Sequence, residues 1–478
     1  MTQVTINRSS AGFGRADQLF IVLLCLTVFW QAALLHALLQ HYPAYGWTTE
    51  HTYGPIAKNL LQYGVYSLGD PPNLQPFNWR PPLYAMTLTL IYGLFGMNDL
   101  YALVWNNLLF TATVLLIFLL GRRLHPWVGL LAALLFVLDP MGVVASNAIQ
   151  ADIQFTFLMA LLLLHTDWIY RQGITMPRLA VNSLILAAVV YTRAAAMYLW
   201  IVLLLALAVH LWRQVSFKRF IQLALLFATI QAIAMGGWMT RNYLVTDRFE
   251  FAGMKYIHLF SFHLPLVISR RDGITFQDAK QQLIRQITND NPAYQQLPTE
   301  VARQDYLLHY AITEIKNNWP YSLLVILDNV PRLFLGYPGE VLTPFYTPDK
   351  LAQYNDFVEH GYPSGTNASL SHDRWHYLRY LIEQGFWPIA AYGIVTKGLG
   401  VVLFGLACFG VVVLVRCRHD QTDRSLGWLL FFFCGTMIAV SCVAIQGRFR
   451  VPILPAMDVL AAYAVIYLVD RKLLKVAV

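Results

Sequence analysis

The chain has 478 residues, of which 57% are hydrophobic and 13% charged, and its formal net charge is +8. A typical soluble domain is about 45–50% apolar and about 25% charged, so this composition argues against a soluble enzyme, a disordered regulator and a nucleic-acid binder. The excess of apolar residues predicts a polytopic membrane protein, and Arg and Lys in its cytoplasmic loops account for the positive charge.

Ten apolar segments approach the roughly 20 residues that a helix needs to cross the hydrocarbon of a bilayer. Asp139-Pro140 lies inside the third of them and predicts a kink there. In chain order the segments are residues 18–40, 100–120, 126–145, 153–170, 179–192, 195–212, 219–238, 398–416, 427–446 and 451–469.

Two further apolar runs, residues 82–96 and 321–336, are short for a span at 15 and 16 residues. If residues 82–96 crossed the membrane alone, every later loop would invert against the positive-inside rule. We therefore expect both runs to be interfacial or re-entrant segments on the outer side. With ten spans, both termini are expected in the cytoplasm.

Two long polar stretches are then expected outside, and they divide the chain into three parts. Residues 1–240 would form an N-terminal transmembrane catalytic module with a first outer loop at 41–99. Residues 241–397 would form an outer-face loop region, where apolar residues at helical spacing predict two amphipathic helices. Residues 398–478 hold the C-terminal transmembrane helices.

Two acidic residues near the expected outer face are candidates for proton transfer. Glu50 lies just beyond the first span, where a carboxylate can accept a proton from an incoming hydroxyl group. Asp152 lies in the outer turn between the third and fourth spans, where an acid is costly unless it has a partner or a function. Both positions also suit an ordinary solvated loop acid, so that alternative stays open.

Arginine residues at the same face are candidates for binding an anion. Arg80 precedes a Pro-Pro pair and a short apolar run, where a guanidinium group can hold a phosphate or simply snorkel to the interface. Other outer arginines oppose the positive-inside rule, namely Arg193, Arg241, Arg448 and Arg450. An anionic ligand would explain the set. For each one, pairing with lipid phosphate or with Glu50 or Asp152 is the alternative.

The sequence offers little support for a cofactor. It holds no nucleotide-binding, nucleophile-elbow or zincin motif. His258 and His263 lack a supporting carboxylate pattern, so interfacial histidines are favoured over metal ligands. No cofactor is therefore predicted, and a divalent metal ion has no support in the sequence.

The order of these motifs resembles that of membrane glycosyltransferases of the GT-C fold. That group includes dolichyl-phosphate-mannose–protein mannosyltransferases and the bacterial lipid A aminoarabinose transferase. The resemblance covers about residues 18–469, and its motifs are Glu50 with Tyr53 and Ala57, Arg80 to Tyr84, Pro140 with Asp152, Thr192-Arg193, Trp238 to Tyr243, and Arg448 to Pro455.

The resemblance implies an all-α, GT-C-like polytopic fold and a specific reaction. A hexosyl or pentosyl group would move from a polyprenyl-phosphate donor to an acceptor hydroxyl, at the outer face of a plasma or bacterial inner membrane. The sequence does not decide whether the acceptor is a glycan, a lipid or a protein. A transporter or flippase of a lipid-linked sugar is the alternative, but it should place ionisable residues at mid-membrane.

The resemblance also implies roles for individual residues. Glu50 would be the base, although relatives usually carry Asp there, so its geometry must differ or Asp152 must share the task. Arg80 would meet the lipid phosphate, assisted by the other outer arginines. Tyr53 and Tyr84 would support the site.

Overall fold

The computed structural model describes residues 14–41, 52–212, 214–335, 382–417, 420–443 and 447–469, with short pieces at 349–350, 352–353 and 379. The described residues are built from helices and connecting turns, and the only strand-like pairing among them is an isolated bridge between Ser67 and Pro76. The expected all-α polytopic architecture is confirmed.

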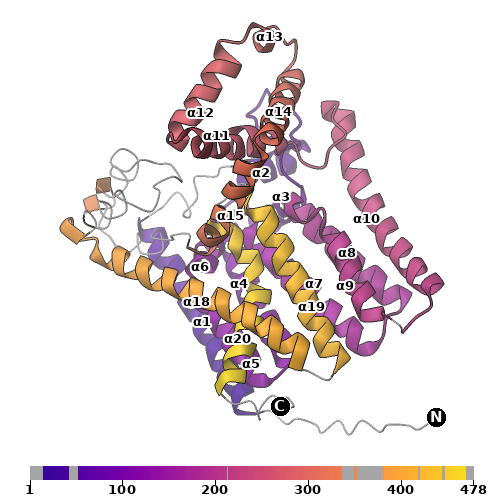
Figure 1. The fold of residues 1–478 in the computed structure, drawn as a ribbon. Helices are drawn as coiled ribbons and strands as arrows, with labels where there is room; N and C mark the ends of the chain where they lie inside the picture. Colours follow the sequence, from indigo (N-terminus) through magenta and orange to yellow (C-terminus); the bar gives the residue numbers. More distant parts are fainter. Residues whose placement is uncertain are drawn as a thin grey trace.

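Eight helical segments are long and apolar enough to cross a membrane, some of them together with an adjoining 3-10 turn. They match eight of the ten segments expected from hydropathy and form the bundle in Figure 1. They are α1 (Arg15–His41), α4 (Asp99–Arg122), α7 (Asp152–Gln172), α9 (Leu199–Leu211), α10 (Phe217–Thr246), α18 (Trp387–Cys417), α19 (Gln421–Ser441) and α20 (Leu454–Val469).

The other two expected spans are also helical, but with different geometry. The third is a bent pair, α5 (Pro126–Leu138) and α6 (Pro140–Ser146), whose axes differ by 66°. Asp139 lies at the break, and its Oδ1 accepts a hydrogen bond of 2.8 Å from the Met141 amide, which caps α6. The predicted kink is therefore confirmed. The fifth expected span is α8 (Met176–Thr192), a helix of 17 residues.

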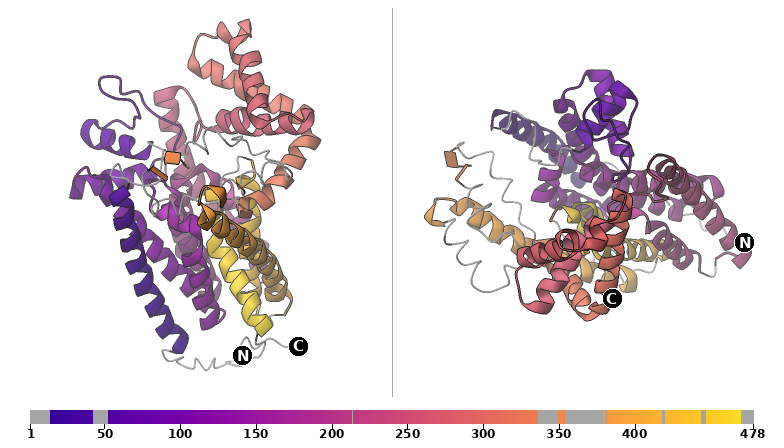
Figure 2. Two further views of the ribbon diagram at one scale, coloured as in Figure 1. Left: turned by 90° about the vertical axis from the view of Figure 1, so that its left-hand side faces the viewer. Right: turned by 90° about the horizontal axis from the view of Figure 1, so that it is seen from above.

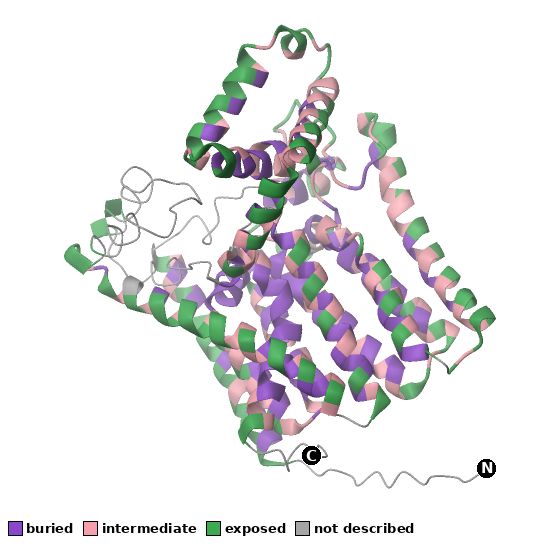
Figure 3. Cartoon of the chain, in the orientation of Figure 1, coloured by how far each residue is buried: buried purple, intermediate pink, exposed green. Residues whose placement is uncertain are grey.

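Burial distinguishes the centre of the bundle from its periphery. In α20, 78% of the apolar window is buried, against 28% in α1, 17% in α10 and 22% in α18. Figure 3 shows exposed residues along the outer helices, and these include large apolar side chains such as Phe29 and Leu225. Such a surface suits lipid rather than water.

Close backbone approach holds α18 against α20. A Cβ atom on Gly410 of α18 would collide with the main-chain carbonyl of Leu460 on α20. Only glycine permits that approach, as is common where helices associate in membranes.

The chain after α10 builds a small lobe beyond one end of the bundle (Figure 1). It contains the π-helical turn η2 (Ile257–His263), α11 (Leu264–Asp272), α12 (Phe276–Ile284), the π-helical turn η3 (Arg285–Asn289), α13 (Pro292–Gln295) and α14 (Glu300–Asn317). The two expected amphipathic helices correspond to α12 and α14. Their apolar faces meet in a core of Phe260, Leu264, Leu283, Ile287, Leu307 and Ala311, which belongs to the lobe itself.

Three further helices lie at the lobe end of the bundle: α2 (Tyr53–Tyr63), α3 (Leu83–Phe95) and α15 (Trp319–Leu335). The two ambiguous apolar runs form α3, with 13 residues, and α15, with 17. At 1.5 Å per residue, α3 is about 20 Å long and is shorter than the roughly 30 Å hydrocarbon core. Both helices expose large apolar side chains, including Leu90 and Leu94 on α3 and Leu327 on α15.

The two ends of the described chain lie at the same end of the bundle. Figure 2 shows that α1 begins and α20 ends at the end of the bundle opposite the lobe. The helix limits differ from the expected module boundaries, because α10 continues to Thr246 and α18 begins at Trp387. The division into three modules stays a prediction.

Candidate functional site

Asp152 and Arg193 meet at the lobe end of the bundle. Asp152 is the first residue of α7 and is 2% exposed, and Arg193 follows the last residue of α8. Arg193 Nη1 donates a hydrogen bond to Asp152 Oδ1, which makes an ion pair between a buried carboxylate and a partly exposed guanidinium group. The carboxylate at a helix N-terminus is also favoured by the helix dipole. Two turns that are separate in the sequence thus form one polar centre.

Arg448 lies next to this pair. It belongs to the 3-10 turn η6 (Gly447–Ile453), and its Nη1 donates to Gln150 Oε1. The Phe449 ring lies 5.0 Å from the guanidinium carbon of Arg193 and 5.7 Å from that of Arg448. One aromatic ring therefore supports two guanidinium groups through cation–π contacts.

Arg80 approaches the same centre from the first outer loop, and its guanidinium carbon lies 5.6 Å from the Tyr53 ring centroid. Burial, together with the charges of Arg193 and Arg448, lowers the pKa of Arg80 to about 10, and the charge of Asp152 opposes this shift. Arg80 is still cationic at neutral pH. We call Arg80, Arg193 and Arg448 the arginine cluster.

Tyr53 and Tyr84 line this region from α2 and α3. Tyr53 is 3% exposed, and its ring meets that of Tyr84 edge-on at 5.0 Å. Burial raises the pKa of Tyr53 to about 12, with Arg193 and Arg448 lowering it and Asp152 raising it. The same charges therefore act on Tyr53 and on Arg80. Tyr84 Oη accepts a hydrogen bond of 2.9 Å from Asn106 Nδ2, which ties α3 to α4.

Arg241 and Arg450 make other contacts. Arg241 Nη1 donates to the Phe77 carbonyl at 2.9 Å, and its guanidinium carbon lies 4.8 Å from the Trp238 ring. Arg450 is 4% exposed and pairs with Asp139 Oδ2 at 3.0 Å. Both side chains brace the main chain or a helix cap. Their role as phosphate ligands stays a prediction.

The expected base, Glu50, lies outside the described residues, which resume at Thr52. Within the described part of the chain, no group of three or more His, Cys, Asp or Glu side chains could hold a metal ion. The chemistry visible at this site is therefore that of cations, aromatic rings and one paired carboxylate.

The structure adds three residues that the sequence analysis did not place here. Gln150 and Phe449 support the arginine cluster, and their only sequence signal is proximity to Asp152 and to Arg448. His258 on η2 is the third. Burial lowers its pKa, and the charges of Arg80 and Arg193 lower it further. His258 therefore lies within the electrostatic reach of the arginine cluster.

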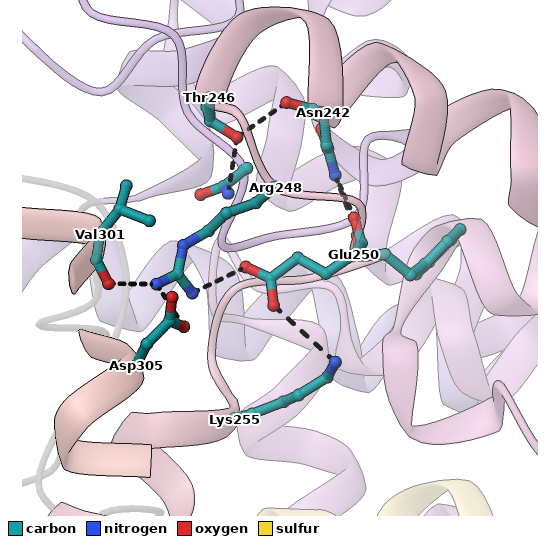
Figure 4. A network of polar contacts seen from close by, with 9 residues as sticks. Asn242, Thr246, Arg248, Glu250, Lys255, Val301 and Asp305 are labelled. Atoms are coloured by element: carbon teal, nitrogen blue, oxygen red, sulfur yellow. Dashed lines mark hydrogen bonds and ion pairs between the residues drawn. The ribbon is translucent and has the colours of Figure 1, made fainter. Parts of the chain in front are cut away.

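A polar network fixes the segment that leads from α10 to η2 (Figure 4). Arg248 Nη2 donates to the Val301 carbonyl at 2.6 Å and to Asp305 Oδ1 at 2.8 Å, so this arginine joins the segment to α14. Asn242 Nδ2 donates to the Glu250 carbonyl at 2.8 Å, which joins it to α10. The network sets the position of the lobe beside the site.

No protein-family model and no curated protein matches the sequence. The fold and site define a helical, multi-pass membrane protein with a cationic centre at one end of its bundle. Among solved structures, ArnT from Cupriavidus metallidurans bound to undecaprenyl phosphate is similar at 14% identity and a TM-score of 0.38, over 91% of this chain and 77% of that chain.

A second similar structure is the oligosaccharyltransferase AglB from Archaeoglobus fulgidus, in complex with an inhibitory peptide and a dolichol-phosphate. It shows 12% identity and a TM-score of 0.44, over 94% of this chain and 50% of that chain. The chain thus spans half the length of the archaeal enzyme. Both neighbours are GT-C fold glycosyltransferases, the class that the motif order resembles. Both TM-scores are below 0.5.

Proposed function

We propose that the chain transfers a sugar from a polyprenyl-phosphate donor to an acceptor hydroxyl group. The observation that carries this proposal is the convergence of Arg80, Arg193 and Arg448 around one described acid, Asp152. Three partly buried guanidinium groups this close together repel one another, and a bound anion would offset that repulsion. A phosphate group at the end of a lipid suits a cationic site at the end of a membrane bundle.

The proposed reaction is a single displacement with inversion at the anomeric carbon. Glu50, three residues before Tyr53 in the chain, takes the proton of the acceptor hydroxyl as its oxygen attacks. The bond from the anomeric carbon to the phosphate oxygen breaks, and its electron pair stays on the phosphate. The arginine cluster stabilises the charge that grows there.

Asp152 is proposed to hold Arg193 in position rather than to act as the main base. Its carboxylate already accepts a hydrogen bond from that guanidinium group. In the proposal, the polyprenyl chain approaches along the exposed apolar faces of α3 and α15, which carry Leu90, Leu94 and Leu327. The lobe, which ends at Asn317, would select the acceptor.

The proposed orientation places the site at the outer face of a plasma or bacterial inner membrane. In support, several arginines lie at the opposite end of the bundle, near the start of α1 and the end of α20. There Arg122 pairs with Asp17 at 2.8 Å, and Arg171 pairs with Asp423 at 2.8 Å. An excess of Arg on that side agrees with the positive-inside rule if both termini are cytoplasmic.

The direct test uses purified protein in lipid nanodiscs, radiolabelled polyprenyl-phosphate sugars and a membrane extract as the acceptor pool. Wild type should transfer label, Glu50→Gln should lose about 10²–10⁴-fold in rate, and Arg80→Ala should lose about 10²–10³-fold. Arg178→Ala is the matched control, because Arg178 bonds the Gly173 carbonyl at 2.8 Å near the opposite end of α7.

Full turnover by Glu50→Gln would remove that residue as the base. Absence of transfer from every donor tested, combined with movement of labelled lipid across the membrane of sealed vesicles, would reject the transferase and favour the flippase.

A further inference from the structure

The lobe brings one histidine beside the arginine cluster through a tightly fitted loop. The Gly253 amide donates to the Asn78 carbonyl at 3.1 Å, and the Tyr256 ring packs edge-on against Trp79 at 6.2 Å. A Cβ atom on Gly253 would lie only 3.1 Å from Trp79 Cδ1, so a larger residue would require the neighbouring side chains to shift. Trp79 directly precedes Arg80 in the chain, and Tyr256 directly precedes η2. The contact between Tyr256 and Trp79 therefore places the start of η2 near Arg80.

His258 lies on η2, which is a π-helical turn. Such turns are rare in proteins, and those that occur are often at functional sites. Its imidazole is half-buried, and its buried Nδ1 has no hydrogen-bond partner among the described residues. A buried nitrogen without a partner is costly, unless a ligand or a proton completes its bonding.

The charges around His258 come from several elements. Arg80 of the first loop and Arg193 at the end of α8 act on it directly, and both lower its pKa in addition to burial. The Phe262 ring lies 6.4 Å from the His258 ring, and Lys280 Nζ of α12 lies 5.8 Å from the Phe262 ring. From α14, Tyr310 faces Phe260 of the same turn.

These positions give His258 a neutral imidazole while the site holds no strong anion. Cations repel the added proton, and a dianion placed among them would remove that repulsion and attract the proton instead. By reciprocity, a group whose proton binding is favoured by phosphate also favours phosphate binding when it is protonated.

We infer that His258 takes up one proton as the phosphate leaving group gains its second negative charge, and that the resulting imidazolium binds that phosphate. This inference rests on the proposed function. The acceptor proton goes to Glu50, the electron pair of the broken bond goes to the phosphate oxygen, and water supplies the proton to His258. The phosphodiester monoanion becomes a monoester dianion, so His258 binds the product more strongly than the donor and assists departure.

The test is isothermal titration of farnesyl phosphate, a short polyprenyl monoester, into the full-length protein at pH 7.5. Two buffers with different ionisation enthalpies report the number of protons taken up. The second pKa of the phosphate is about 6, so the ligand itself is mostly dianionic and can only release protons. Wild type should take up close to one proton for each ligand bound.

His258→Gln should bind farnesyl phosphate several-fold more weakly and take up no proton, and its affinity should be flat from pH 6.5 to 8.5. His258→Asn repeats the measurement on a second side chain. His263→Gln is the matched control on the same turn, because His263 Nε2 instead lies 2.8 Å from Ser322 Oγ. That control should keep the uptake. Farnesyl methyl phosphate, a monoanion, should cause little uptake in wild type.

Unchanged proton uptake in His258→Gln, or tight binding without uptake in wild type, would overturn the role of His258 alone. Failure of wild type to bind farnesyl phosphate would overturn the proposed function and this inference together. Inorganic phosphate separates the two sources of the anion. Weak binding with the same proton uptake supports a headgroup site completed by the lipid, whereas binding as tight as that of farnesyl phosphate would overturn the lipid headgroup as the ligand.

Discussion

Asp152 forms an ion pair with Arg193, and its carboxylate is buried whereas the guanidinium group is partly exposed. Asp152 begins α7, and Arg193 directly follows α8. The pair joins two turns. In this position the Arg193 guanidinium group lies over the Phe449 ring, and its charge, like that of Arg448, acts on Arg80. The sequence left the roles of Asp152 and Arg193 open. Their contact fixes both side chains at the centre where the arginine cluster meets.

Removing one partner of this pair should destabilise the protein strongly. Arg193→Ala should cost about 3–5 kcal/mol, because Asp152 would be buried without this partner, and Asp152→Ala should cost less, because Arg193 is partly exposed. The double variant should cost less than the sum of the two, and thermal unfolding in detergent measures all three. The partly exposed pair of Lys58 and Asp99, at 2.9 Å, is the control and should be worth about 0–1 kcal/mol. Additive losses at Asp152 and Arg193 would show that the pair is not coupled.

Arg448 and Arg450 should differ in what they support, although they are two residues apart. Arg448→Ala should lower transfer about 10²–10³-fold with little change in melting temperature, because it borders the proposed phosphate position. Arg450→Ala should lower the melting temperature, because it leaves Asp139 and the Phe334 carbonyl without their buried partner. Thermal unfolding and a transfer assay on the same preparations check both. The opposite pattern would place Arg450, not Arg448, at the site.

Gly410→Ala should separate α18 from α20. The added methyl group would meet the main-chain carbonyl of Leu460, which cannot rotate away as a side chain would, so a loss of about 1–3 kcal/mol is expected. Gly398→Ala on the same helix is the control, because a Cβ atom there meets nothing within 4 Å. Thermal unfolding of both variants in one detergent gives the comparison, and equal melting temperatures would contradict the close packing.

His263 should make the stability of the lobe depend on pH. Burial lowers its pKa in the folded protein, whereas in the unfolded chain the pKa is about 6.5. As the pH falls through about 6.5, the unfolded state binds the proton first, so the folded state loses stability. His263→Gln should therefore flatten the fall in melting temperature between pH 7.5 and 5.5. His309→Gln, at an exposed position on α14, controls for replacing a histidine. A slope as steep as that of wild type would show that His263 does not contribute.

Hydropathy and local chemistry were enough to locate the long apolar helices of this protein. All ten expected spans are helical, and the kink lies at Asp139-Pro140 as predicted. Such features depend on runs of apolar residues and on the backbone limits of proline, which act over a few residues. The third expected span is divided at Asp139-Pro140, and α8 ends at Thr192, just before Arg193.

The sequence by itself also determined which residue types gather at the proposed outer face, since motif order placed Arg80, Asp152, Arg193, Arg241, Arg448 and Arg450 near helix ends. Only the tertiary structure decided their partners. Arg193 and Arg448 share Phe449 beside Arg80, whereas Arg241 and Arg450 turn to main-chain and capping groups. His258 lies within the electrostatic reach of the cluster because the lobe packs against Trp79, with Gly253 at the contact. Side-chain contacts of this kind depend on how distant segments pack, and no periodicity within one segment specifies that packing.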